Sequence, residues 1–237
     1  MAVHTLSRLL IGAALIFAVM AYEATDRSTA TTAPIESEGF NETARELFSA
    51  GFAGNQESLA RGMALVEETL KADPDHTGAL VWQASGWIFQ SRDHFREGDR
   101  DAGRALFAKG VAQMDRAVSL APDSLQTLIP RAAVMLCSAP HIPDATIRTR
   151  FLETAAGDYT KILEIRSPDF DSLSMFTRGE LLGALAEALW RLERREEAGV
   201  YLQRMIDELP DSPYSLMARK QLDKPDTTAR LTWFGCQ

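Results

Sequence analysis

The sequence predicts an all-α protein built as an array of helical hairpins, and three observations lead to this fold class. First, four Pro-Asp pairs begin at Pro74, Pro122, Pro168 and Pro210, in steps of 48, 46 and 42 residues. Second, each pair closes a stretch whose apolar residues recur at helical spacing. Third, hydrophobic residues make up 46% of the chain, which fits a folded domain. A nearly constant period of this size is typical of stacked helical hairpins.

The charge balance limits the classes of partner. The 237 residues carry a net charge of −8. No basic run follows the N-terminal segment, so a nucleic-acid backbone is not expected as a ligand. The chain has two cysteines, Cys137 and Cys236. Cys137 lies in an apolar run and is interpreted as a small buried residue, although a disulfide between the two cysteines stays open.

Residues 1–24 have the features of an export signal or a membrane anchor. Arg8 precedes an apolar run from Leu9 to Ala21, and Glu23 follows it. Cleavage as a signal peptide and retention as an anchor both remain open. The anchor is favoured because the cleavage pattern is imperfect, and a helix buried in the fold is a third option. The order of charges places the bulk of the chain outside the cytoplasm. We therefore expect a protein of the bacterial inner membrane facing the periplasm, or a periplasmic one after cleavage.

A polar, flexible linker is expected over residues 25–39, and a helical domain over residues 40–223. In this domain the second helix of each hairpin has apolar residues in steps of three or four, which form one face of an α-helix. The four stripes are Leu59, Met63, Val66 and Leu70; Phe107, Val111, Met114 and Val118; Leu152, Ala156, Tyr159 and Leu163; and Ala198, Leu202, Met205 and Leu209.

Proline explains where each of these helices ends, because it lacks the N–H that would continue the hydrogen-bond ladder. The aspartate, or a nearby serine such as Ser172 or Ser212, can then cap the next helix. Pro213 follows Ser212 at a first helical position, which predicts a short capping helix from Ser215 to Leu222. Residues 224–237 are expected to form a C-terminal tail, docked on the last helix or loose.

The first helices carry a family resemblance. Trp82, Ser85, Gly86 and Phe89 have the spacing W-x₂-L-G-x₂-Y, and Leu182, Leu185, Ala186 and Leu189 occupy the same slots before Ala198 and Pro210. These residues resemble the tetratricopeptide repeat family. The resemblance covers residues 40–223 and implies a right-handed α-solenoid of about four hairpins plus the capping helix. Small residues in the Gly86 and Ala186 slots let two helices approach closely.

The sequence also departs from the family pattern. Its periods exceed the family's unit of about 34 residues. In the second hairpin the excess is a charged insert, Ser91 to Arg104, which is expected to be a solvent-exposed helix extension.

The resemblance implies a binding groove. In the tetratricopeptide family the first helices line a concave groove, at positions offset from the packing slots. The corresponding partner-binding groove residues are Gln83, Trp87, Gln90, Glu187, Trp190 and Arg191. Tryptophan is a typical anchor for a polypeptide contact. Simple packing of Trp87 or Trp190 against a neighbouring helix remains the alternative.

No catalytic constellation stands out in the sequence. The four histidines lack the spacing of a helical metal site, nucleotide and nucleophile motifs are missing, and carboxylate pairs such as Glu67-Glu68 are interpreted as solvated helix faces. We expect no catalytic residue, no metal and no cofactor; a hydrolase with an unrecognised site is the least favoured possibility.

The expected function is a non-enzymatic protein–protein interaction module, an adaptor or scaffold in a bacterial cell-envelope complex. The partner is expected to offer an extended peptide segment or to be a subunit of that complex. The alternative is an accessory component of a solute transporter that binds a small ligand.

Overall fold

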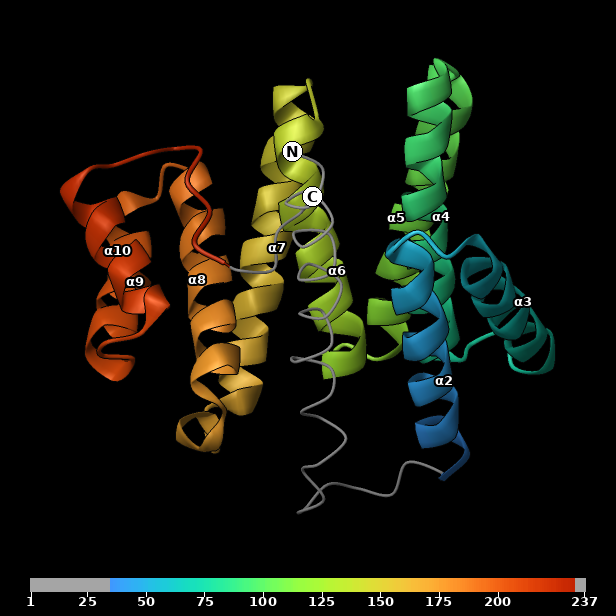
Figure 1. Ribbon diagram of the computed structural model, residues 1–237, viewed down its shortest axis with the longest axis horizontal. Coiled ribbons are helices and arrows are strands. Elements are labelled where there is room, and N and C mark those ends of the chain that lie inside the picture. The colour runs from blue at the N-terminus through green and yellow to red at the C-terminus, as the bar shows by residue number, and fades with distance from the viewer. Residues whose placement is uncertain (1–34, 233–237) are drawn as a thin grey trace, which may run out of the picture. The chain divides into compact units, whose positions relative to one another are not determined.

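The computed structural model describes residues 35–232, and every regular element in that range is a helix (Figure 1). The predicted all-α class is therefore confirmed for these residues. The α-helices are α2 (Ile35–Phe52), α3 (Gln56–Ala72), α4 (Thr77–Glu97), α5 (Arg100–Leu120), α6 (Leu125–Ser138), α7 (Ala145–Arg166), α8 (Met175–Arg191), α9 (Arg195–Glu208) and α10 (Pro213–Asp223). Two 3₁₀ turns, η1 (Ala139–His141) and η2 (Phe170–Ser172), lie between them.

The described residues begin after the expected export segment and within the expected linker. The predicted segment over residues 1–24 lies outside the described residues. Within residues 35–232, no helix combines the length and the apolar character needed to cross a membrane. Helix α2 begins at Ile35, so the last part of the segment expected as a linker over residues 25–39 is helical.

The helix ends confirm the role assigned to proline. Helices α3, α5, α7 and α9 end at Ala72, Leu120, Arg166 and Glu208, in each case two residues before the Pro-Asp pair. The reason is steric as well as chemical, because the residue before a proline is driven out of helical geometry. The four periodic pairs therefore mark real helix ends.

The helix starts are fixed by short side chains that accept hydrogen bonds from free backbone N–H groups. Such caps are formed by Asn55, Asp99, Asp144, Ser174 and Ser212. The capping helix predicted from Ser215 to Leu222 is present as α10, with Ser212 as its cap. The prediction that Ser172 caps the next helix is wrong. Residues 170–172 form η2 instead, and the cap of α8 is Ser174.

The charged insert is a helix extension, as predicted. Helix α4 continues to Glu97 and α5 starts at Arg100, so each of the two helices has 21 residues. Gly98 between them has a φ of 87°, a left-handed conformation that glycine adopts without strain. The long period of this hairpin therefore comes from two elongated helices joined by a short turn.

The described chain divides into two compact units, one ending at Thr127 and the other beginning at Leu128. In the first unit, α2 packs on α3, α3 on α4, and α4 on α5. The rings of Phe48 and Trp82 stack with their centroids 5.3 Å apart in its core. A β-carbon at Gly86 would lie within 3.0 Å of Met63 and Phe48, so the close helix approach predicted at that slot is confirmed.

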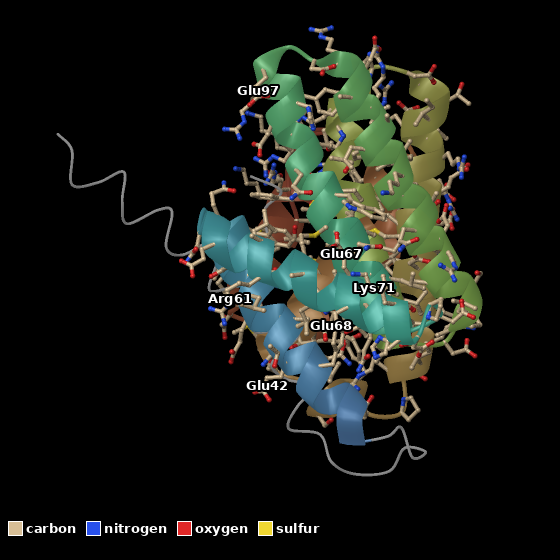
Figure 2. All side chains as sticks on the ribbon, turned by 90° about the vertical axis from the view of Figure 1, so that its right-hand side faces the viewer. Glu42, Arg61, Glu67, Glu68, Lys71 and Glu97 are labelled. Carbon is tan, nitrogen blue, oxygen red and sulfur yellow. The ribbon has the colours of Figure 1, made fainter. Side chains whose placement is uncertain are left out.

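Charged side chains gather on the outer face of this unit. Figure 2 shows Arg61, Glu67, Glu68 and Lys71 along α3, and all four are exposed. Their exposure confirms that the Glu67-Glu68 pair belongs to a solvated helix face.

Helix α8 is the central element of the second unit. It contacts α7, α9 and α10, and every residue from Gly179 to Trp190 is buried. An α-helix that is buried all round needs neighbours on every side. Figure 1 shows that the segment following α10, drawn in red, runs back to α8 and lies beside it. A non-helical stretch of chain therefore takes one of the positions around α8.

Candidate functional site

The three groove residues predicted in the first unit belong to α4, and two of them are engaged with α5. Gln83 is buried, and its Oε1 accepts a hydrogen bond from Gln113 Nε2 at 2.7 Å. Trp87 is half-buried, with Lys109 Nζ 3.7 Å from the centre of its ring. Gln90 is also half-buried. Gln83 and Trp87 thus make contacts within their own hairpin, and a binding role for the three stays a prediction.

The three residues predicted in the second unit lie at the end of α8. Glu187 and Trp190 are only 2% and 6% exposed. Arg191 Nη2 is 2.7 Å from Glu187 Oε1. The Arg195 guanidinium of α9 covers the Trp190 ring at 4.3 Å, while Trp190 Nε1 has no hydrogen-bond acceptor among the described residues. Trp190 is therefore packed inside the unit, whereas the buried Glu187 forms an ion pair with the half-buried Arg191.

One face of α8 combines two carboxylates with small residues. Glu180, Gly183 and Glu187 follow one another at steps of three and four, so they share a face of the helix. At one end, Tyr214 Oη of α10 donates a hydrogen bond to Glu180 Oε1 at 2.7 Å. The Tyr214 ring lies where a β-carbon on Gly179 would stand. The missing side chain at Gly179 therefore lets an aromatic ring reach a buried carboxylate.

At the other end, the same face holds an extended piece of the chain. We call residues Asp226–Thr232 the C-terminal strap. The backbone N–H of Leu231 donates to Glu187 Oε2 at 2.8 Å in a buried environment, and Leu231 is 2% exposed. A β-carbon at Gly183 would lie well under 3.0 Å from the Leu231 carbonyl oxygen. The backbone of the strap can reach α8 only because residue 183 is glycine.

The strap joins α10 through a polar turn. Gln221 Nε2 donates to the Asp226 carbonyl oxygen at 2.7 Å. The Asp226 carboxylate accepts from the N–H and the hydroxyl of Thr228 at 2.8 and 2.7 Å, a local side-chain-to-backbone motif typical of turns. Residues 222–228 are all exposed. The strap therefore leaves α10 through solvent before Leu231 enters the fold.

Burial shifts the pKa values of ionisable groups at this site. Burial raises the pKa of Glu187 above its usual value, and the opposing effects of Arg191, the Leu231 N–H and Arg230 do not cancel the rise. Burial also raises the pKa of Tyr159, and the nearby negative charges, with Glu180 the largest, add to the effect. A buried carboxylate is costly unless hydrogen bonds and positive charge surround it. This face of α8 can therefore hold an N–H donor and a cationic group.

A separate, largely buried ion pair joins α6 and α7. Arg131 of α6 binds Asp158 of α7 through two parallel hydrogen bonds of 2.8 and 2.7 Å, a geometry that fixes both side chains. Among residues 35–232, no group of histidine, cysteine and carboxylate side chains has an arrangement that could hold a metal ion.

A shallow hollow of about 260 Å³ lies elsewhere in the second unit. It is lined by Leu163, Ser167, Phe170, Asp171, Arg204 and Glu208. The Arg204 guanidinium covers Phe170 at 5.1 Å and binds Glu208 at 2.6 Å. This volume is below the roughly 300–1,000 Å³ of ordinary small-molecule sites.

Cys137 is not the fully buried small residue that its apolar neighbours predicted. It is disulfide-bonded and only half-buried. The sequence has one other cysteine, Cys236, which lies outside the described residues.

The sequence reasoning identified Glu187 and Arg191 but missed the residues that contact them. Gly183 and Leu231 received no role, and Glu180 with Tyr214 was not noticed. A signal was present in the sequence, because Glu180 directly precedes the apolar stretch from Leu181 to Trp190 and Glu187, seven residues later, interrupts it. Acidic residues on the buried face of a helix need hydrogen-bonding or charged partners. Because Glu180, Gly183 and Glu187 share one face of the helix, such partners must contact α8 on that face.

Comparison with known proteins adds no relative: no family model, curated protein or solved structure matches this chain.

Proposed function

We propose that this protein is a non-enzymatic interaction module that binds an extended polypeptide segment along the α8 face formed by Glu180, Gly183 and Glu187. It acts as an adaptor or scaffold in a bacterial cell-envelope complex. Its helical hairpins form a right-handed solenoid that resembles the tetratricopeptide repeat family. Such arrays act through surfaces rather than through reactive groups.

The docking of Leu231 is the observation that carries this proposal. An extended stretch of polypeptide lies against α8, donates a backbone N–H to Glu187 at 2.8 Å and buries an aliphatic side chain. Backbone hydrogen bonds with a buried side chain are the common means by which proteins bind extended peptides. The α8 face thus already accommodates the class of ligand that we propose for it.

The oxidation state of Cys137 supports export to the cell envelope. Disulfides persist in oxidising compartments such as the bacterial periplasm and are rare in the cytosol, and Cys137 is disulfide-bonded. The apolar run from Leu9 to Ala21 supplies the means of export in this proposal, either as a retained anchor or as a cleaved signal.

Selection from a displayed library of short random peptides tests the function. The full chain and its Leu231→Ala variant serve as baits, because the variant loosens the strap. We expect enriched peptides that lose binding when Gly183→Ala is added to the variant. The control is Gly199→Ala, since a β-carbon at Gly199 of α9 meets no atom within 4 Å. The proposal would be contradicted if neither bait enriched any peptide, or if the enriched peptides bound equally well to proteins with and without Gly183→Ala.

The alternative, an accessory component of a solute transporter that binds a small ligand, has less support. The shallow hollow beside Phe170 is small and polar, and the Arg204 cation next to it already binds Glu208. A small apolar or zwitterionic solute would find little enclosed surface there.

A further inference from the structure

We propose that the C-terminal strap is an intramolecular ligand that occupies the α8 face at rest, and that a partner must displace it. We further infer that the partner segment repeats the strap's chemistry: an extended backbone with a basic residue directly before a leucine-like one. This inference rests on the proposed polypeptide-binding function and adds its regulation and the sequence class of its partner.

The segment that carries Leu231 to α8 lies at the surface. The strap contains no helix, and it reaches α8 through the exposed residues 222–228. Gln221 of α10 donates a hydrogen bond to the Asp226 carbonyl oxygen, and the turn from Asp226 to Thr228 is internal to the strap. Both can persist when the later residues move. Leu231 lies on α8 at a sequence distance of 44 residues from Glu187. Release of Leu231 from α8 therefore requires no helix to unfold.

The α8 face selects its occupant by three features. Glu187 needs a hydrogen-bond donor, because a buried carboxylate that loses its partner is strongly destabilised. The burial of Leu231 requires an aliphatic side chain at the position of that donor. The charge of Arg230 lowers the pKa of Glu187, so a cation directly before the aliphatic residue stabilises the buried carboxylate.

Gly183 adds a geometric restriction. Because a β-carbon there would collide with the Leu231 carbonyl group, the face admits a polypeptide backbone at close range. A partner that satisfies all three features must run along the same path, so it cannot bind while the strap is in place. The strap and the partner are therefore mutually exclusive, and the partner shifts a population between closed and open forms.

The first test is competition with the strap's own sequence. A fluorescein-labelled peptide with the sequence of Asp226–Thr232 is titrated with the full chain, and binding is followed by fluorescence anisotropy. We expect the Leu231→Ala variant to bind the peptide at least about tenfold more tightly than the wild type, because its own strap has lost the buried side chain. Peptides with Ala in place of Leu231, or Glu in place of Arg230, should bind more weakly than the parent peptide.

Matched glycine variants locate the binding. Adding Gly183→Ala to the Leu231→Ala variant should abolish peptide binding, whereas adding Gly199→Ala should leave it unchanged, because only the first β-carbon meets the bound backbone. Circular dichroism of each variant establishes that the helices remain.

A second measurement uses the wild-type chain and does not depend on any variant folding. Hydrogen exchange of the Leu231 amide is followed while unlabelled peptide is added. We expect exchange to accelerate at saturating peptide, because the peptide replaces the Leu231 N–H on Glu187. An exchange rate that does not change overturns the inference.

The outcomes separate this inference from the proposed function. If wild type and Leu231→Ala bind the peptide equally and both lose binding with Gly183→Ala, the face binds peptides but the strap does not compete. If neither the wild type nor the Leu231→Ala variant binds the strap peptide, but the library yields peptides whose binding is lost with Gly183→Ala, the partner chemistry inferred from the strap is wrong. If both experiments find no binding, the strap is a permanent part of the fold and both proposals fail.

Discussion

The substitution Gly183→Ala gives the most direct test of how the second unit is held together. Glycine in the middle of a helix is less favourable than alanine by about 1 kcal/mol, so α8 taken alone should gain stability. In the folded chain, however, the new β-carbon would stand under 3.0 Å from the Leu231 carbonyl oxygen and 3.1 Å from its carbonyl carbon. Ordinary contacts begin at 3.4 Å. The strap must therefore shift away from α8.

The cost of this shift follows from what Leu231 contributes. Removing a buried leucine side chain costs about 2–5 kcal/mol, and a hydrogen bond to a charged group contributes about 1.5–3 kcal/mol. These contributions overlap, and the helix gain of about 1 kcal/mol opposes them. We therefore expect Gly183→Ala to lower the free energy of unfolding of the second unit by about 1–4 kcal/mol.

Thermal unfolding and amide exchange measure the two parts of this prediction. The variant should melt at a lower temperature, and the Leu231 amide should exchange faster than in the wild type. Gly199→Ala is the control, because it adds the same helix preference in open space and should be neutral or slightly stabilising. A Gly183→Ala protein as stable as the control, with Leu231 still protected, would refute the close approach between the strap and α8.

Three further predictions concern the same unit. Trp190→Ala should destabilise the fold by about 3–5 kcal/mol, similar to the 2–5 kcal/mol expected for Leu202→Ala, because both side chains are buried. Chemical denaturation measures the free energy of unfolding of both variants. A tryptophan variant with unchanged stability would place the ring at the surface. The raised pKa of Glu187 means that the folded state binds more protons there than the unfolded state. The stability of the wild type relative to Glu187→Gln should therefore fall as the pH rises from about 4.3 through the raised pKa. Melting temperatures of both proteins measured across this pH range should show a difference that changes with pH. A difference that does not depend on pH would contradict the raised pKa of Glu187. Reduction should lower stability by about 2–4 kcal/mol, typical for a disulfide, whereas Cys137→Ala should be insensitive to reductant; equal responses of the two proteins would show that Cys137 does not contribute.

The local features of the fold were predictable because their causes are local. A proline stops a helix by removing its own N–H and by restricting the residue before it, so the ends at Ala72, Leu120, Arg166 and Glu208 follow from the sequence. The elongated α4 and α5 follow from a charged but helix-compatible insert. The cap of α8 was misplaced by two residues because η2 intervened, and such short turns leave little trace in a hydrophobic pattern.

Two residues of the site were predicted from the sequence, but the segment that contacts them was not. Glu187 and Arg191 were selected from a resemblance to a repeat family, which named a face but not its occupant. The pattern of apolar residues says that α8 is buried, but not that one of its neighbours is an extended strap. Nothing in the tail from residue 224 onward predicts regular structure, so the only expectation was that it docks on the last helix or stays loose.

The sequence by itself therefore determined the all-α fold class and the four helix ends before the Pro-Asp pairs, because each depends on residues within a few positions of one another. The tertiary structure alone decided what satisfies the buried carboxylates of α8. The hydrogen bond from Leu231 to Glu187 spans 44 residues, and the gap that admits it exists because Gly183 has no side chain. Contacts of this kind depend on where a distant segment passes in space, and local periodicity carries no information about that path.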